Sequence, residues 1–316
     1  MARWEYTLGL QEIAPGIYAY LQPDGSWGLN NAGLITGQDE SLIIDTLYDL
    51  DLTAEMLAAM RKASPTAAAE FDILVNTHAN GDHIYGNELV NAGEIIATKA
   101  CAEEFCDVPP QMMADILAAA PGMGELGRFF QSSFGRFHFQ GITLTPPTRT
   151  FEGHLDIEVG NREVSLIQVG PCHTKGDLIV WVPEGRIVFA GDVLFINGTP
   201  IMWAGPVDNW FNALDTIGGL KPEVIVPGHG PITDQTGLDE TRAYFDYLVA
   251  EGEKRFKAGQ SVVEASRELM KGTYSRWGDP ERVAINLDTL YRQFGNDPTP
   301  ASAVELFGIM AELTAN

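Results

Sequence analysis

Four of the six histidines in this chain, and two of its aspartates, follow short apolar runs and stand beside glycine, aspartate or asparagine. The run Phe71–Val75, for example, leads to His78, and the run Arg186–Ala190 leads to Asp192. Because loops that follow strands converge at one end of a sheet, we expect these side chains to meet in one site. The candidate residues are His78, Asp82, His83, His173, Asp192 and His229.

This mixture of side chains is typical of a metal site that performs hydrolysis. Imidazole suits zinc and other borderline first-row metals, whereas carboxylates add negative charge and can bridge two ions. An ion with an open coordination position lowers the pKa of its bound water to about 7, so that hydroxide is available at neutral pH. Any single histidine is more often structural than a ligand, but six positions in the same context favour a metal site. His138 and His154 lack that context and are not included.

The composition excludes several classes of function. Of the 316 residues, 45% are hydrophobic and 20% are charged, as in ordinary globular enzymes. The formal net charge of −23 opposes binding to nucleic acids and to anionic membranes, so neither partner is expected. No apolar run is long enough for a transmembrane helix. The N-terminus lacks the layout of a secretory signal and the three cysteines show no disulfide spacing, which predicts a cytoplasmic protein.

The elements that must position the candidate residues alternate between strands and helices. Strands are predicted at 17–21, 31–36, 41–45, 71–75, 155–159, 163–169, 178–182, 186–190 and 224–226, with helices at 53–63 and after Trp210. The stretch of about 101–150, rich in phenylalanine and methionine, is predicted to form two or three helices. It could pack in the core, cover a pocket or form an oligomer contact.

The order and context of the candidate residues resemble the metallo-β-lactamase-fold superfamily over most of residues 10–235. The family motif His-x-His-x-Asp-His corresponds to residues 78–83, and His173, Asp192 and His229 match the family's later ligand positions. The resemblance implies an α/β fold, a four-layer αββα sandwich. Residues 1–316 are then expected to form one domain, with the helical insert at about 101–150 and a helical tail at about 236–316.

One position departs from the family motif, because Asn80 stands where the second histidine is expected. The resemblance implies that one ion takes the positions of His78, Asn80 and His173, and that the other takes Asp82, His83 and His229, with Asp192 bridging. An amide oxygen is a weaker ligand for zinc than imidazole. We therefore predict that the Asp82/His83/His229 half is the tighter one, and that the other half is weak, empty or filled by a harder metal. Asn80 could instead point away and hydrogen-bond the metal-bound water.

We also expect specific roles for several neighbours of the candidate ligands. Asp45 matches an early acidic position that usually supports a ligand in the family. Cys172 is expected to pack as a small hydrophobe, and Asp177 is expected to hold the loop around His173. Lys175 could either pair with a substrate carboxylate or be solvated at the surface.

The predicted reaction is metal-dependent hydrolysis of a small or medium acyl compound, such as an ester, lactone, thioester or lactam. The cofactor is expected to be zinc, as one or two ions, with other divalent metals possible in the His78/Asn80/His173 half. A hydroxide on the metal would attack the acyl carbon, oriented by Asp82 or Asp192. The apolar insert, together with a group of residues after Asp192, predicts a hydrophobic pocket. That group is Phe195, Ile196, Met202 and Trp203.

Three alternatives stay open at this point. The same fold could serve a dehalogenase or a sulfatase, because one fold hosts many chemistries. Iron-dependent sulfur oxidation is a second alternative, although Asn80 counts against it because that chemistry is expected to retain the second histidine. A third is a non-catalytic metal-binding module. The expected partner is a small-molecule substrate, with a possible homo-oligomer contact through the 101–150 insert.

Overall fold

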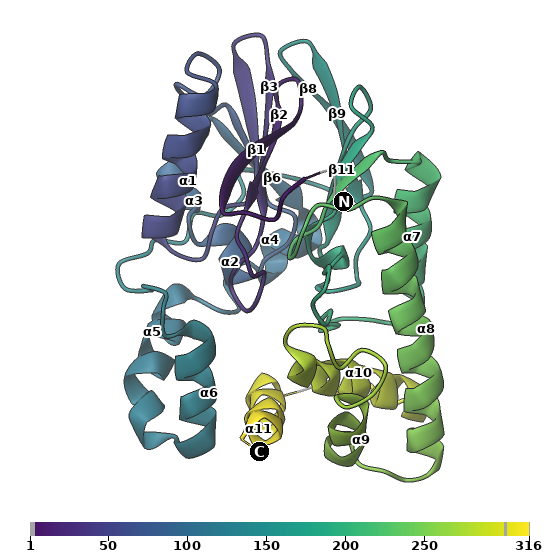
Figure 1. Cartoon of the computed structure of the whole chain (residues 1–316). Coiled ribbons are helices and arrows are strands. Elements are labelled where there is room, and N and C mark those ends of the chain that lie inside the picture. Colours follow the sequence, from purple (N-terminus) through teal and green to yellow (C-terminus); the bar gives the residue numbers. More distant parts are fainter. Residues whose placement is uncertain (1–3, 300–301, 316) are drawn as a thin grey trace.

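The computed structural model describes residues 4–299 and 302–315, which form two β-sheets packed face to face with helices outside them (Figure 1). Within these residues the first sheet contains, in order, β1 (Gly9–Ala14), β2 (Ile17–Leu21), β3 (Ala32–Gly37), β4 (Glu40–Ile44), β5 (Ile73–Val75), β6 (Glu94–Thr98) and β7 (Arg149–Phe151). The second contains, in order, β12 (Val224–Val226), β11 (Ile187–Phe189), β10 (Leu178–Val182), β9 (Arg162–Gln168) and β8 (His154–Val159).

Several strands are apolar on both faces, and each sheet is therefore covered on both sides, by the other sheet and by helices. Side chains alternate along a strand, so neighbouring residues face opposite sides of a sheet. In β4 Leu42 packs between the two sheets, whereas Ile43 packs against the outer helix. In β10 Val180 packs between the sheets and Ile179 faces the helices on the other side. The sandwich therefore has three apolar layers of contact.

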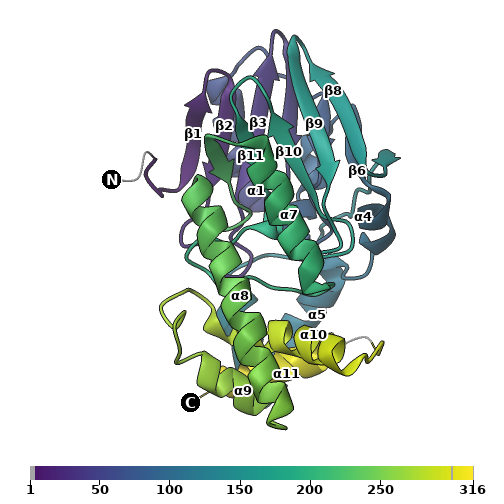
Figure 2. The same cartoon turned by 90° about the vertical axis from the view of Figure 1, so that its right-hand side faces the viewer.

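Helices cover each outer face of the sandwich. Helix α1 (Leu50–Ala63) begins at Asp49, whose side chain accepts a hydrogen bond from the backbone N–H of Leu52, and it buries Met56 and Met60 against the first sheet. Helices α7 (Val207–Leu220) and α8 (Gln235–Lys257) cover the second sheet, as Figure 2 shows. The predicted four-layer αββα sandwich is confirmed.

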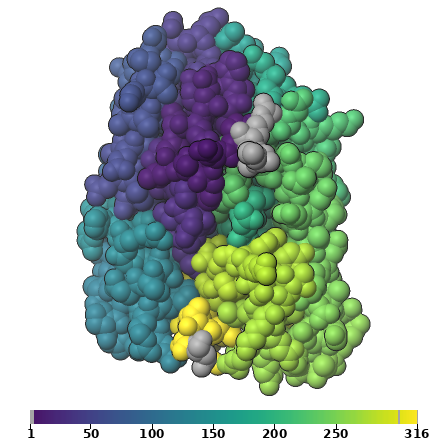
Figure 3. All heavy atoms as spheres, viewed as in Figure 1, coloured from purple at the N-terminus to yellow at the C-terminus, as the bar shows by residue number. Residues whose placement is uncertain are grey.

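The first part of the insert, up to Phe134, and most of the tail are helical, and α6 of the insert packs against α11 of the tail below the sheets. The insert contains α4 (Lys99–Glu104), α5 (Pro110–Ala119) and α6 (Gly124–Phe134), and the tail continues from α8 with α9 (Val262–Leu269), α10 (Val283–Gly295) and α11 (Ala303–Thr314). Figure 3 shows the teal insert and the green and yellow tail as one continuous lower half. Phe307 of α11 lies against Phe129, Phe130 and Phe134 of α6, with ring centroids 5.0–6.4 Å apart.

This contact gives the aromatic face of the insert a partner within the same chain, since α11 covers it. The oligomer contact that was expected through the insert stays a prediction. None of the described helices combines the length and the apolar composition that crossing a membrane requires. Three short helices follow strands on the side of the candidate ligands: α2 (Gly81–Ile84), α3 (Asn87–Val90) and the 3-10 helix η2 (Gly191–Val193). Two further 3-10 helices, η1 (Ala120–Gly122) and η3 (Pro280–Arg282), lie in the insert and in the tail.

Candidate metal centre

The candidate ligands follow strands that end at one edge of the sandwich. In the first sheet β4 and β5 are parallel, and they lead to Asp45 and His78. In the second sheet β9 is antiparallel to β10, β10 is antiparallel to β11, and β11 is parallel to β12, so β9, β11 and β12 run in the same direction. These strands lead to His173, Asp192 and His229. Helix α2 supplies the two predicted residues that remain.

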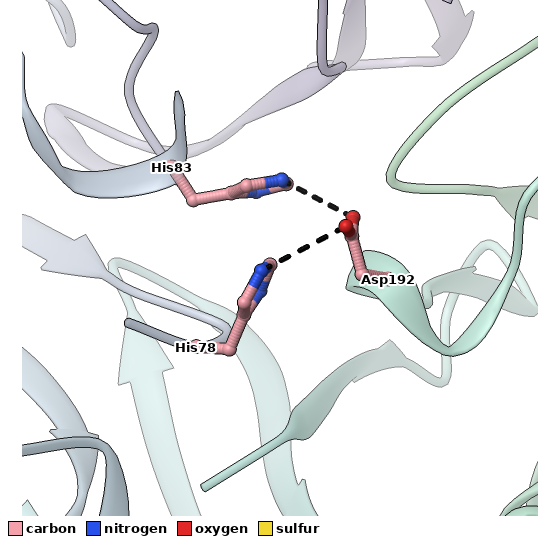
Figure 4. Close-up of side chains that lie close together, drawn as sticks. All are labelled: His78, His83 and Asp192. Atoms are coloured by element: carbon pink, nitrogen blue, oxygen red, sulfur yellow. Dashed lines mark ion pairs between the residues drawn. The ribbon is translucent and has the colours of Figure 1, made fainter. Parts of the chain in front are cut away.

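Asp192 lies at the centre of this set, and four histidines surround its carboxylate. Oδ1 of Asp192 is 3.1 Å from Nε2 of His83. Oδ2 is 3.4 Å from Nε2 of both His173 and His229, and 3.8 Å from Nε2 of His78. Figure 4 shows the rings of His78 and His83 directed at the Asp192 carboxylate. The structure thus brings the predicted histidines together around one predicted aspartate.

Hydrogen bonds behind the site determine which ring nitrogen of His78 and His83 carries the proton. Nδ1 of His83 donates to Oδ2 of Asp45 over 2.8 Å, because a carboxylate can only accept. The hydroxyl of Thr77 donates to the same Asp45 oxygen over 2.7 Å, so its own oxygen accepts from Nδ1 of His78 at 3.0 Å. In the neutral form of each ring, the lone pair of Nε2 is therefore directed into the site.

His173 and His229 are held in the same way by backbone carbonyls. Nδ1 of His173 donates to the carbonyl oxygen of Ile201 over 2.6 Å, and Nδ1 of His229 donates to that of Gly25 over 3.1 Å. Metal-binding histidines typically donate their second N–H to such an acceptor, which holds the ring and its tautomer. All four histidines thus present Nε2 to a common centre.

The donor set fits a divalent metal ion. Nε2 of His78, Nε2 of His83 and Oδ1 of Asp192 are buried atoms without a hydrogen-bond partner in the described residues. Unpaired buried polar atoms are rare in folded proteins, and an ion would satisfy these three. Two trios have ligand atoms within 4.8 Å of one another: His78, His83 and Asp192, and Asp82, His83 and His229. Nitrogen and oxygen ligands in this ratio suit zinc and similar metals.

The charges of the candidate ligands also favour the binding of a cation. Burial raises the pKa of a carboxyl, but the imidazoles around Asp192 outweigh burial and hold its pKa well below the usual range. Burial opposes charge on His229, yet Asp192 and Asp82 outweigh it and raise the pKa of His229 to about 9. The same competition raises the pKa of His83 well above its usual value, whereas burial lowers that of His78. A metal ion would take the place of these bound protons.

Asn80 and Asp82 form the more accessible side of the site. The side chain of Asp82 is 14% exposed, compared with 5% for His229. Nδ2 of Asn80 lies 3.0 Å from Nε2 of His173, so Asn80 points into the site and not away from it. The trio of Asp82, His83 and His229 is the half that the sequence predicts to be tighter. The stoichiometry and the roles of the individual ligands stay predictions.

Two glycines allow the Asp192 and His229 loops to approach each other. Gly191 has a φ of +51°, a conformation that side chains disfavour, and it begins η2 immediately before Asp192. A Cβ on Gly228 would collide with Oδ1 of Asp192. The backbone N–H of Gly228 donates to the carbonyl of Gly191 over 2.8 Å. Any side chain at residue 228 would therefore displace the central carboxylate.

The neighbours of His173 have structural roles. Asp177 accepts hydrogen bonds from the backbone N–H groups of Cys172 and Thr174, each over 3.0 Å, and so holds the loop on both sides of His173. Cys172 is buried, and its thiol bonds to backbone oxygens, which matches the packing role. Lys175 is 68% exposed and pairs with Glu104 over 3.3 Å. It is therefore engaged at the protein surface.

Aromatic side chains border the site on the histidine side. Phe195 stacks on His229 with ring centroids 5.0 Å apart and an interplanar angle of 3°. It also lies 5.8 Å from the ring of His173. Met202, in contrast, packs among the core residues between the second sheet and its helices. Of the apolar residues expected in the pocket, Phe195 therefore contacts the ligand rings, whereas Met202 packs in the core.

Two tryptophans extend this apolar border to the C-terminal helix. Trp27 lies two residues after the carbonyl that holds His229, and Trp203 lies two residues after the carbonyl that holds His173. Both rings lie 6.0 Å from the ring of Phe307 on α11. Trp203 and Phe307 are half-buried, so part of their apolar surface stays accessible.

Sequence reasoning missed several residues of this arrangement. Thr77 could have been noticed as a hydroxyl beside His78, but Gly25 and Ile201 act through backbone carbonyls, which leave no trace in residue type. Trp27 and Phe307 lie far from the ligands in sequence, so nothing in the residues around them indicated that they belong to this arrangement.

Comparisons with known proteins agree with this geometry. A family model described as Metallo-beta-lactamase superfamily matches residues 25–229. The 2,4-dinitroanisole O-demethylase subunit alpha of Nocardioides sp. (strain JS1661) is 26% identical over an alignment of 254 residues that covers 78% of this chain and 66% of that protein. The acyl-coenzyme A thioesterase MBLAC2 of Bos taurus is 23% identical over 216 residues, covering 63% of this chain and 72% of that protein.

A solved structure shows the same fold over nearly the whole chain. The stereoselective inverting sec-alkylsulfatase Pisa1 from Pseudomonas sp. superposes with a TM-score of 0.67 at 18% sequence identity, covering 93% of this chain and 52% of that chain. The family match spans well over half of the residues and includes the segments that bring the four histidines and Asp192 together. The chain therefore belongs to the metallo-beta-lactamase superfamily, whose members are mostly hydrolytic enzymes.

Proposed function

We propose that this chain is a metal-dependent hydrolase, with zinc as the expected ion, that acts on a small or medium acyl compound such as an ester, thioester, lactone or lactam. The observation that carries the proposal is the set of four imidazoles whose Nε2 atoms surround Asp192 while each Nδ1 is held from behind. A divalent ion bound there supplies an activated water and polarises the carbonyl that is attacked.

The two aspartates have different environments, and we assign them different roles. Asp192 is 3% exposed and lies among four imidazoles, so it balances their charge and holds the ligands together. Asp82 is the more exposed carboxylate, and its Oδ2 is 3.4 Å from Nε2 of His229. Asp82 is therefore the group that can orient the attacking water and accept its proton at the side from which substrate arrives.

The aromatic border supports a substrate with an apolar part. Phe195 stacks against a ligand histidine, and Trp203 and Phe307 present half-buried rings further out. Binding sites for small molecules are mostly apolar with a few polar groups that orient the substrate. An acyl chain or ring would lie along this border with its carbonyl at the metal. The acyl-coenzyme A thioesterase MBLAC2, to which the chain is similar, acts on an acyl compound, which agrees with an acyl substrate.

The test is hydrolysis by the intact protein, after metal removal and reloading with zinc. A panel of p-nitrophenyl esters, acyl thioesters, lactones and a chromogenic cephalosporin should contain at least one compound that is hydrolysed only after zinc is restored. With zinc at saturation, Asp82→Asn should lower kcat on that compound by roughly 10²-fold or more, because general-base assistance is lost.

The matched control is Asp39→Asn, an exposed aspartate in the turn between β3 and β4 at the opposite edge of the sheet. It should hydrolyse the same compound as the unmodified protein does. Turnover that survives complete metal removal would contradict the proposal. Activity confined to alkyl sulfates or alkyl halides, or oxygen uptake with bound iron, would replace it with one of the other chemistries of the fold.

A further inference from the structure

We propose that Asn286, on α10 of the C-terminal tail, is a positioning residue that sets the ring orientation and tautomer of His173. The inference rests on the proposed metal centre, because it concerns how one of its ligands is held. Asn286 is buried, and it lies outside the residues that the family model matches. It makes no contact with the other ligands and acts on His173 through the segment at Ile201.

The amide of Asn286 holds the segment on both sides of Ile201. Its Oδ1 accepts a hydrogen bond from the backbone N–H of Met202 over 2.7 Å, and its Nδ2 donates to the carbonyl of Pro200 over 2.8 Å. The same Nδ2 donates to the hydroxyl of Tyr244 on α8 over 3.0 Å. One buried side chain thus ties two tail helices to the backbone beside the metal centre.

The peptide unit between Ile201 and Met202 transmits this contact to His173. The carbonyl of Ile201 and the N–H of Met202 belong to one planar peptide, so its two edges move together. One edge donates to Asn286, and the other accepts from Nδ1 of His173 over 2.6 Å. The two hydrogen bonds form a relay: Nδ1–H of His173 donates to the carbonyl of Ile201, and the N–H of the same peptide donates to Oδ1 of Asn286. Each bond therefore polarises the other.

The backbone of His173 is attached to the same short segment. The backbone N–H groups of Trp203 and Ala204 donate to the carbonyl of His173 over 3.0 and 3.1 Å. These bonds locate the backbone of His173 and do not involve its ring. The Ile201 carbonyl is the acceptor that holds Nδ1 of the ring, while Asn80 meets its Nε2. Asn286 holds the peptide that carries this carbonyl, and Thr289 donates to the next carbonyl, that of Met202, over 2.8 Å.

Loss of Asn286 should therefore affect His173 selectively. Without the amide, the Ile201–Met202 peptide can rotate and its carbonyl can leave Nδ1. Nδ1–H then loses its acceptor, and the tautomer with the proton on Nε2, which cannot bind a metal through the nitrogen that faces the site, gains population. The ligands on the other side of Asp192 keep their own partners, Asp45 behind His83 and Gly25 behind His229.

The experiment compares Asn286→Leu with Tyr244→Phe, each in the full chain. Leucine has a similar size but removes both bonds to the segment, whereas Tyr244→Phe removes only the third partner of the amide and leaves the segment bonds in place. The first measurement is the tautomer of His173 from ¹⁵N-histidine NMR of the metal-free protein. The second is zinc affinity, measured by chelator competition.

In the unmodified protein and in Tyr244→Phe we expect the Nδ1–H tautomer. In Asn286→Leu we expect a mixture of tautomers, and zinc binding about tenfold weaker at the half that uses His173, with the Asp82/His83/His229 half unchanged. A general loss of stability would weaken both halves and would not change the tautomer selectively.

Native tautomer populations in Asn286→Leu would overturn the proposal, as would equal changes in Tyr244→Phe. If Asn286→Leu does not fold, Asn286→Gln displaces both amide atoms while it keeps a polar side chain, and the same tautomer change is expected. A native tautomer in Asn286→Gln would also overturn the proposal. If the unmodified protein binds no zinc, the proposed function fails, but the tautomer comparison still tests the role of Asn286.

Discussion

Asp45 and His83 form a carboxylate–imidazole pair in which Nδ1 donates to Oδ2 over 2.8 Å, while Nε2 of the same ring lies 3.1 Å from Oδ1 of Asp192. Asp45 also accepts from the backbone N–H and the hydroxyl of Thr77, each over 2.7 Å. One buried carboxylate thus holds the residues behind two of the proposed ligands, His83 directly and His78 through Thr77.

Replacing Asp45 by asparagine should weaken zinc binding by roughly 10- to 100-fold. An amide nitrogen in place of Oδ2 would face two donors and force His83 toward the tautomer with its proton on Nε2. Chelator competition measures the affinity. Asp49→Asn is the control, because Asp49 is a buried aspartate that caps α1 and holds the backbone N–H of His138. Equal affinities in the two variants would mean that Asp45 does not support the metal.

Asn80→His should raise the zinc stoichiometry from near one toward two. Asn80 already points at Nε2 of His173 over 3.0 Å, and imidazole is a stronger zinc ligand than an amide. Metal analysis of the protein after gel filtration measures the stoichiometry. Asn161→His, an exposed site in the turn between β8 and β9, should leave it unchanged. Two tightly bound zinc ions in the unmodified protein, unaffected by Asn80→His, would show that the two halves are equivalent.

Zinc affinity should rise with pH up to about 9. The pKa of His229 is raised to about 9 by Asp192 and Asp82 against the effect of burial, so below that pH the ion must displace a proton from this ring. Each displaced proton makes the apparent affinity rise about tenfold per pH unit, and this term levels off above pH 9. Calorimetry in buffers of different ionisation enthalpy counts the protons released. An affinity that is flat between pH 6 and pH 9 would contradict the expected competition.

Phe307→Ala should raise KM for esters with long acyl chains about tenfold, with little change in kcat, because it removes apolar contact area and no reacting group. Acetyl esters, which do not reach that far, should be hydrolysed with a nearly unchanged KM. The control is Phe256→Ala, a half-buried aromatic of the same tail that packs on Tyr291 and Phe294. If both variants change KM equally for all chain lengths, Phe307 has a structural role only.

The strands, the outer helices and the ligand positions were predictable because they depend on local patterns. Strand β4 is an apolar run because both of its faces are buried. In β8 exposed residues alternate with half-buried or buried ones because only one of its faces is covered. His78 and Asp192 were recognisable from their residue types and from their place after strands. These features are encoded within a few neighbouring residues.

The supports behind the ligands were not predictable, because they depend on contacts between distant segments. Ile201 and Gly25 act through backbone carbonyls, which every residue type carries. Asn286 reaches Met202 across 84 residues of sequence. Nothing in a helix of the tail distinguishes a buried asparagine that holds a metal ligand from one that caps a turn.

The sequence alone therefore determined the family, the sandwich and the set of side chains that converge, because residue type and strand context specify them. Only the tertiary structure decided how those side chains are held. It showed that Asn80 points into the site, that Asp82 is the more accessible carboxylate and that Phe307 of the tail lies against Trp203. The physical reason is that ring tautomer, exposure and packing are properties of surroundings assembled from distant parts of the chain.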